Sequence, residues 1–124
     1  MKKGILITNN PMFKEFKSKS LQVKFREISA LDIIVIVRDF LHKNYKLLTH
    51  PLHSSLKPNE TPYRSIVISD KVGAMVDFES IQLIETAKAS YEKFLNDKPV
   101  ELRDEDILKD YQTIDCDLIL KAME

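Results

Sequence analysis

The sequence predicts a three-layer α/β/α sandwich around about four mostly parallel strands, flavodoxin-like or Rossmann-like in type. Apolar segments of strand character alternate with segments of helical spacing, which favours parallel pairing through right-handed crossovers. The first strand candidate, residues 4–8, is apolar without a break, as expected of a strand covered on both faces. With 124 residues, the chain is expected to form a single domain, 1–124.

The segment after the first strand candidate has the residues of a helix start. Asn10 can cap a helix whose first residue is Pro11, and the predicted helix ends near Lys19. Residues 21–25 then alternate between apolar and polar side chains, a period that indicates a strand with one solvated side. Such a strand is most easily placed at the edge of the sheet.

The next element shows a conflict between propensity and spacing. Ser29 and Asp32 have the spacing of a capping box, so a helix is expected after Ser29. Residues 33–37 are all β-branched and by propensity favour a strand. The apolar residues nevertheless keep a helical spacing as far as Asn44, and we therefore predict a helix.

The second half of the chain supplies two more strands and two long helices. Residues 45–49 and 65–69 are the third and fourth strand candidates. Asp77 can cap a long helix that Pro99 closes. A last helical segment begins near Asp104, and Thr113 could break it into two pieces. The simplest strand order for this arrangement is 2-1-3-4.

Charge, cysteine and glycine content exclude several classes of protein. Lys and Arg total 19 and Asp and Glu also total 19, so no nucleic-acid binding is expected. Cys116 is the single cysteine, and no internal disulfide can form. No apolar run suits a signal peptide or a membrane span, so we expect a cytoplasmic protein that does not bind membranes. The two glycines, Gly4 and Gly73, form no phosphate-binding loop, and no cofactor is predicted.

The segment Thr49–Ser65 is the most informative part of the sequence. No helical crossover of normal length fits between the two strand candidates that it joins. Its prolines, Pro51, Pro58 and Pro62, fix the backbone and bias the residues before them toward extended geometry. Long loops without regular structure are uncommon in compact domains and are usually functional. We therefore predict an ordered loop that forms the working surface of the protein.

Polar residues follow several strands of the predicted sheet. In open parallel sheets, ligands bind beyond the carboxyl ends of the strands, where these residues would meet. The helix expected after Asn10 would point its free N–H groups toward an anion at the same edge. Lys57 and Arg64 would add positive charge. The candidate ligand-binding residues are Thr8, Asn9, Asn10, Thr49, His50, Lys57, Asn59, Glu60, Tyr63, Arg64 and Ser69.

His50 is the candidate catalytic residue, because imidazole titrates near neutral pH and can act as a base or nucleophile. The structural alternative is a ring that only hydrogen-bonds its own loop. His50 and His53, with Glu60 or Asp70, could form a metal site. Two histidines in an irregular loop are a weak metal pattern, however, and no metal is predicted. The other candidates also have structural alternatives, namely helix capping and covering of the sheet end.

Two segments of the chain resemble the GrdX family. They are Ile7-Thr8-Asn9-Asn10-Pro11 and Leu48-Thr49-His50-Pro51-Leu52, the latter followed by Lys57-Pro58-Asn59-Glu60-Thr61-Pro62-Tyr63-Arg64-Ser65. GrdX proteins are small and are encoded with the selenium-dependent glycine, sarcosine and betaine reductases of anaerobic bacteria. The resemblance implies a cytoplasmic accessory or regulatory protein of an amino-acid-fermenting anaerobe. It implies no reaction, and nothing in this chain resembles the selenocysteine or pyruvoyl chemistry of the catalytic reductase subunits.

Two functional hypotheses follow. The first is an uncharacterised accessory or regulatory protein that binds a small anionic metabolite, or a protein of the reductase system, through Thr49–Ser65. The second is a small enzyme acting on a phosphorylated or carboxylated metabolite, with His50 as base or nucleophile and Lys57 and Arg64 holding its charge. Burial of the loop against a second copy, giving a homo-oligomer, is a third option. Convergence of Asn10, His50 and Arg64 in one concave site would favour ligand binding.

Overall fold

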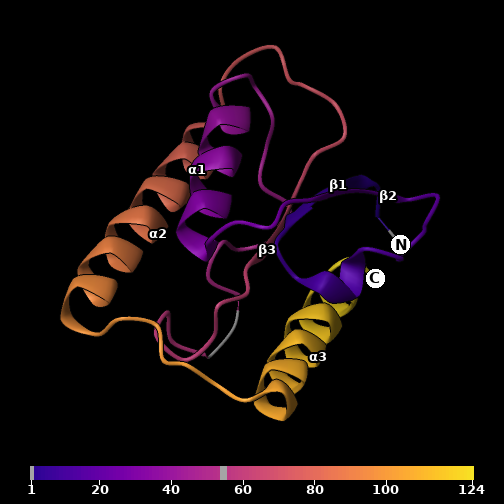
Figure 1. The fold of residues 1–124 in the computed structure, drawn as a ribbon. Helices are drawn as coiled ribbons and strands as arrows, with labels where there is room; N and C mark the ends of the chain where they lie inside the picture. Colours follow the sequence, from indigo (N-terminus) through magenta and orange to yellow (C-terminus); the bar gives the residue numbers. More distant parts are fainter. Residues whose placement is uncertain (1, 54–55) are drawn as a thin grey trace.

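The computed structural model describes residues 2–53 and 56–124 (Figure 1). Strand β1 (Gly4–Thr8) lies in the centre of a small sheet of order β2-β1-β3. Strand β2 (Leu21–Phe25) pairs with β1 in parallel, whereas β3 (Ser65–Ile68) pairs with β1 antiparallel. The edge position predicted for residues 21–25 is confirmed.

The predicted three-layer sandwich with about four mostly parallel strands is wrong. In the described part of the chain the sheet has three strands and is mixed. Residues 45–49 form no strand, and their only ladder pairing is an isolated antiparallel bridge from Leu47 to Ile68. The physical reason is the connection Thr49–Ser65, which contains no helix among its described residues. Parallel neighbours need a long crossover, whereas a connection of this kind returns the chain antiparallel.

Each of the three long helices begins at a side-chain cap. Helix α1 (Ala30–Leu41) starts where the Oγ of Ser29 accepts the N–H of Asp32 at 3.1 Å, which confirms the capping box. Helix α2 (Phe78–Asp97) is capped by Asp77, whose pKa is lowered by hydrogen bonds from Ser80.

Helix α3 (Glu105–Ala122) begins where Asp104 accepts the N–H of Ile107 at 3.0 Å. It continues through Thr113 without a break. The last helical segment predicted from the sequence is therefore confirmed, and it is not divided at Thr113.

The helix predicted from Pro11 to near Lys19 is wrong. Asn10 does cap the segment, since its Oδ1 accepts the N–H of Met12 at 3.0 Å, but only the single 3-10 turn η1 (Pro11–Phe13) forms. The sheet face that a helix here would cover is occupied by α3, which packs against η1 and β3 (Figure 1). Helix propensity in residues 14–19 is thus overridden by tertiary packing.

Alternate residues of the strands build two separate cores. Ile5 and Ile7 face one cluster, which helices α1 and α2 complete, while Leu6 between them faces the other. This second cluster is closed by η1 and α3. Its buried members are Leu6, Phe13, Leu21, Val67, Ile119 and Met123. Strands buried on both faces explain why residues 4–8 are apolar without a break.

The close approach of β1 and β3 requires glycine at position 4. A Cβ atom there would lie 2.6 Å from Cγ1 of Val67 and 2.8 Å from the carbonyl oxygen of Ile68. We expect Gly4→Ala to lower the free energy of unfolding by about 1–3 kcal/mol, because the strands must separate. The matched control is Gly73→Ala, whose Cβ would have ordinary contacts at 3.6 Å and beyond. Equal urea midpoints for the two variants would contradict the close-approach account.

Candidate functional site

A buried polar network lies where β1 ends and β3 begins. The strand register pairs Thr8 with Ser65, and their hydroxyl oxygens are 2.6 Å apart. The carboxylate of Asp115 on α3 accepts the hydroxyl proton of Ser65 and, at 2.9 Å, an amide N–H of Asn10. All four side chains belong to buried residues. The network therefore joins α3 to the central strand through polar contacts that are shielded from water.

His53 completes the network from the Thr49–Ser65 segment. Its Nε2 lies 3.4 Å from Oδ1 of Asp115, and both side chains are more than nine-tenths buried. Ser65, His53 and Asp115 are the residue types of a hydrolytic triad, but here the carboxylate stands between the other two. In a catalytic triad the imidazole stands in the middle and takes the serine proton. In the observed order Ser65 has no imidazole base and its hydroxyl is bound to the carboxylate, so the cluster is suited to holding the loop on α3.

Asn9 holds the other end of the same segment. Its Oδ1 accepts the backbone N–H of Arg64 at 2.8 Å. Its amide nitrogen donates to the carbonyl oxygens of Ile28 and Pro62, at 2.9 and 2.8 Å. The segment is thus fixed by side-chain hydrogen bonds rather than by a strand ladder, as its prolines require.

Arg64 is the most unusual residue of the segment because its guanidinium is buried with incomplete pairing. The residue is 1% exposed. Nε and Nη2 both donate to the hydroxyl oxygen of Tyr91 on α2, at 3.1 and 2.8 Å, whereas Nη1 has no hydrogen-bond partner. No carboxylate of the described residues forms an ion pair with it. A buried positive charge without an anion is unfavourable by several kcal/mol, on the order of the desolvation cost of one ion.

Tyr91 also forms part of the wall of a cavity of about 180 Å³, which we call the Tyr91 cavity. It is enclosed by the first turn of α1, the later part of the proline-containing segment and the buried side of α2. The lining residues are Ser29, Ala30, Leu31, Pro58, Thr61, Pro62, Tyr91, Leu95 and Val100. Arg64 itself is not among the lining residues, although Tyr91, its hydrogen-bond partner, is.

The remaining predicted residues of the loop make contacts that hold its shape. Thr49 accepts the N–H of Val67, and the hydroxyl of Tyr63 accepts from Gln112 at 2.7 Å. Within residues 57–61, Glu60 accepts the backbone N–H of Lys57 at 3.0 Å. The amide of Asn59 donates to Glu101 at 3.2 Å. Their ligand-binding role stays a prediction.

His50 lies apart from the Tyr91 cavity. It lines a separate hollow of about 290 Å³ with Leu52 and one side of α2. Its Nδ1 accepts the backbone N–H of Leu52 at 3.0 Å, so in the neutral ring the proton is on Nε2. Asn10, His50 and Arg64 share none of the cavities found between described residues.

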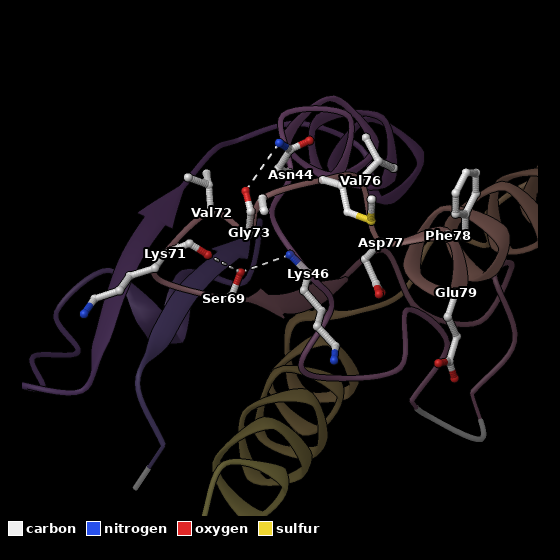
Figure 2. A pocket seen from close by; sticks show the side chains of 12 residues that line it. Asn44, Lys46, Ser69, Lys71, Val72, Gly73, Val76, Asp77, Phe78 and Glu79 are labelled. Carbon is white, nitrogen blue, oxygen red and sulfur yellow. Dashed lines mark hydrogen bonds between the residues drawn. The ribbon is translucent and has the colours of Figure 1, made fainter.

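Ser69 lies at the opposite end of the sheet from Thr8. The antiparallel register pairs Thr8 with Ser65 and Ile5 with Ile68, so the predicted convergence of Ser69 with Thr8 is wrong. Ser69 instead lines a cavity of about 580 Å³ (Figure 2). There its hydroxyl donates to the carbonyl of Lys71 and accepts the N–H of Lys46. Whether Ser69 contacts a ligand stays a prediction.

The structure also bears on metal and thiol chemistry. Within residues 2–53 and 56–124, no three His, Cys, Asp or Glu side chains are grouped so as to hold a metal ion. Burial, and then the carboxylates of Asp117 and Asp115, raise the pKa of the Cys116 thiol, so it is mostly protonated at neutral pH. No helix in the described part of the chain is long and apolar enough to cross a membrane.

Asp115 and Tyr91 were not predicted from the sequence to be residues of this site. A signal for Asp115 was present, because it lies four residues before buried Ile119 on the apolar stripe of α3. An acid in such a stripe indicates a buried partner. Tyr91 was recognised only as a core residue, since a spacing of 27 residues gives no indication of its contact with Arg64.

A family model described as GrdX-like protein matches residues 5–124, nearly the whole chain, which confirms the resemblance seen in two segments of the sequence. Neither a curated protein nor a solved structure matches the chain.

Proposed function

We propose that this chain, which belongs to the GrdX-like family, is a non-catalytic accessory or regulatory protein that binds a small anionic metabolite through its Thr49–Ser65 segment. The proposal includes a role beside the glycine, sarcosine and betaine reductases with which GrdX proteins are encoded. The observation that carries it is Arg64, a buried guanidinium whose Nη1 has no partner.

Electrostatics supports an anion rather than a neutral ligand. Arginine cannot lose its proton in a protein, so its charge must be compensated in another way. The phenol oxygen of Tyr91 is a neutral acceptor and supplies only part of that compensation. An anionic oxygen at Nη1 would add a charge-assisted hydrogen bond, which is about twice as strong as a neutral one.

An enzyme with His50 as general base or nucleophile is less well supported. The hydrogen bond from the Leu52 N–H to Nδ1 makes the outer nitrogen of the neutral ring a donor. A general base needs a free lone pair within reach of the substrate proton. Binding of a protein of the reductase system is the remaining alternative, and it becomes the better account if no small anion binds.

The proposal predicts that small anions raise the melting temperature of the protein and that Arg64→Met removes the effect. A ligand at a hundred times its dissociation constant adds about 2.7 kcal/mol, which corresponds to a shift of several degrees. The measurement is a thermal-shift titration with acetate, butyrate and phosphate at constant ionic strength. Circular dichroism of the variant shows whether the fold is retained.

The matched control is His50→Ala, because His50 lines a different hollow. We expect this variant to keep the full anion-dependent shift. A shift that persists in Arg64→Met but disappears in His50→Ala would contradict the proposal and favour the enzyme hypothesis. The absence of any shift would favour binding of a reductase-system protein, which a pull-down with the reductase components tests.

A further inference from the structure

We infer that the loop between β3 and α2, together with the first turn of α2, forms the interface of a homodimer whose partner is a second copy of this chain. These residues, 69–79, line most of the cavity of about 580 Å³ shown in Figure 2, and we call them the 69–79 surface. The surface takes no part in the proposed anion binding. Three observations carry the inference: exposed apolar side chains, hydrogen bonds that fix the shape of the loop, and the separation of its charges.

The 69–79 surface exposes apolar side chains that the fold of one copy leaves in water. Residues 72–76 have the sequence Val-Gly-Ala-Met-Val, a run without a polar side chain. The exposed fractions of Val72, Met75 and Phe78 are 56%, 74% and 80%. Single exposed apolar residues are common on proteins, whereas a group of large ones around one hollow is typical of an interaction site.

Hydrogen bonds hold this surface in one shape. The N–H of Gly73 donates to the carbonyl oxygen of Asn44 at 2.9 Å, and the side-chain amide of Asn44 donates back to the carbonyl oxygen of Gly73 at 3.4 Å. Asn44 has a φ of 73°, in the left-handed region that asparagine adopts more readily than most residues. At the start of the loop, the hydroxyl of Ser69 joins the N–H of Lys46 to the carbonyl oxygen of Lys71 (Figure 2). A surface that is already ordered loses less conformational entropy when a partner binds.

The charges of the surface favour a second copy as the partner. Two cations lie on one side of the hollow and two anions on the other, and from left to right in Figure 2 they are Lys71, Lys46, Asp77 and Glu79. None of the four forms an ion pair within residues 2–53 and 56–124. A partner of one charge sign would be attracted to one side and repelled by the other. A two-fold rotation instead brings the cationic side of each copy against the anionic side of the other.

The same rotation covers the apolar side chains. Val72 lies beside Lys71 at one side of the hollow, and Phe78 lies beside Glu79 at the other (Figure 2). Bringing the two sides together therefore sets Phe78 of each copy against Val72 of the other. The hollow is lined by 12 residues, fewer than the roughly 20–30 residues a side of a standard interface, so we expect a dissociation constant in the micromolar range.

The first test is sedimentation equilibrium of the whole protein at concentrations from about 1 μM to about 1 mM. We expect a reversible equilibrium between monomer and dimer. Phe78→Ala should raise the dissociation constant at least about tenfold, because aromatic side chains at the centre of an interface often dominate its affinity. Leu102→Ala, which removes a fully exposed apolar side chain elsewhere, should leave it unchanged. A protein that stays monomeric throughout this range, or a dimer that Phe78→Ala does not weaken, would overturn the inference.

Charge reversal tests the two-fold arrangement itself. Asp77 caps α2, so the outer pair of Lys71 and Glu79 is the one to change. Lys71→Glu and Glu79→Lys should each weaken the dimer at least about tenfold, since two pairs of charges change from attraction to repulsion. Both residues are exposed, so the fold should be retained, which circular dichroism checks.

A mixture of the two charge-reversed variants should form a heterodimer about as stable as the wild-type dimer. In that heterodimer the two reversed positions face each other, and so do the two unchanged ones. Reversals without effect, or a mixture that does not recover, would overturn the two-fold contact. None of these variants changes Arg64, so the anion-dependent thermal shift should persist in all of them, and the two proposals can fail separately.

Discussion

Asp115→Ala should lower the free energy of unfolding by about 3–5 kcal/mol, the range for removing one member of a buried charged cluster. The carboxylate accepts hydrogen bonds from Asn10 and Ser65 and lies 3.4 Å from the imidazole of His53. Alanine would leave the Asn10 amide and the Ser65 hydroxyl buried without this acceptor, and it would remove the carboxylate beside the His53 imidazole. Urea unfolding monitored by circular dichroism gives the free energy, and α3 should exchange its amide protons faster in the variant.

The control for this prediction is Asp117→Ala on the same helix. Asp117 is exposed, so its removal should change stability by no more than about 0.5 kcal/mol. Asp115→Asn keeps the shape and one acceptor, and it should fall between the two. A cost below about 1 kcal/mol for Asp115→Ala would mean that the network is open to water and does not hold α3 in place.

Phe13→Ala should lower the free energy of unfolding by about 3–5 kcal/mol, as for other large-to-small changes in a core. Phe13 is fully buried in the cluster of Leu6, Val67 and Ile119, and its ring meets that of Phe16 edge-on at 5.6 Å. Truncation would open a void between β1 and α3. The measurement is again the denaturant midpoint, with an unchanged slope showing that the fold is kept.

Met12→Ala is the matched control, since Met12 is the preceding residue of η1 and is 44% exposed. We expect a loss of no more than about 0.5 kcal/mol. Similar losses for the two variants would indicate that η1 acts through its backbone conformation rather than through the Phe13 side chain.

Local signals predicted most of the elements. The cap at Ser29 and the helical spacing that follows prevailed over the β-branched run of residues 33–37, because α1 buries one face against the sheet and α2. The edge placement of β2 followed from its alternating pattern. Both predictions were correct because the residues of each segment determine its secondary structure.

Strand direction and the covering of the sheet faces could not be predicted from such local patterns. The direction of β3 depends on how the chain returns between residues 49 and 65, and a buried four-residue strand reads alike in either direction. A helix can form after Pro11 only if the sheet face beside it is free. That face is occupied by α3, which lies nearly a hundred residues later in the chain and is joined to Asn10 by the hydrogen bond to Asp115. Because β3 runs antiparallel to β1, Ser69 lies at the opposite end of the sheet from Thr8, contrary to the prediction.

The candidate site was predictable in part. The predicted segment supplies the buried Arg64, and its Pro58, Thr61 and Pro62 line the Tyr91 cavity, while the ligand-binding role of its residues stays a prediction. The position of the guanidinium behind Tyr91, and the apolar wall beside it, are products of how α1 and α2 pack together. No pattern within one segment carries that information.

The most direct test of anion binding observes the guanidinium itself, by heteronuclear NMR of the arginine side-chain N–H groups with and without butyrate. The account predicts that the Nε–H and Nη–H resonances of Arg64 shift on addition of butyrate and stay in place with butyramide, the uncharged amide of the same acid, because Nη1 gains an anionic partner. Arg38, whose guanidinium pairs with Glu85 on the surface, serves as the internal reference. Arg64 resonances that do not respond to butyrate, or that move no more than those of Arg38, would contradict it.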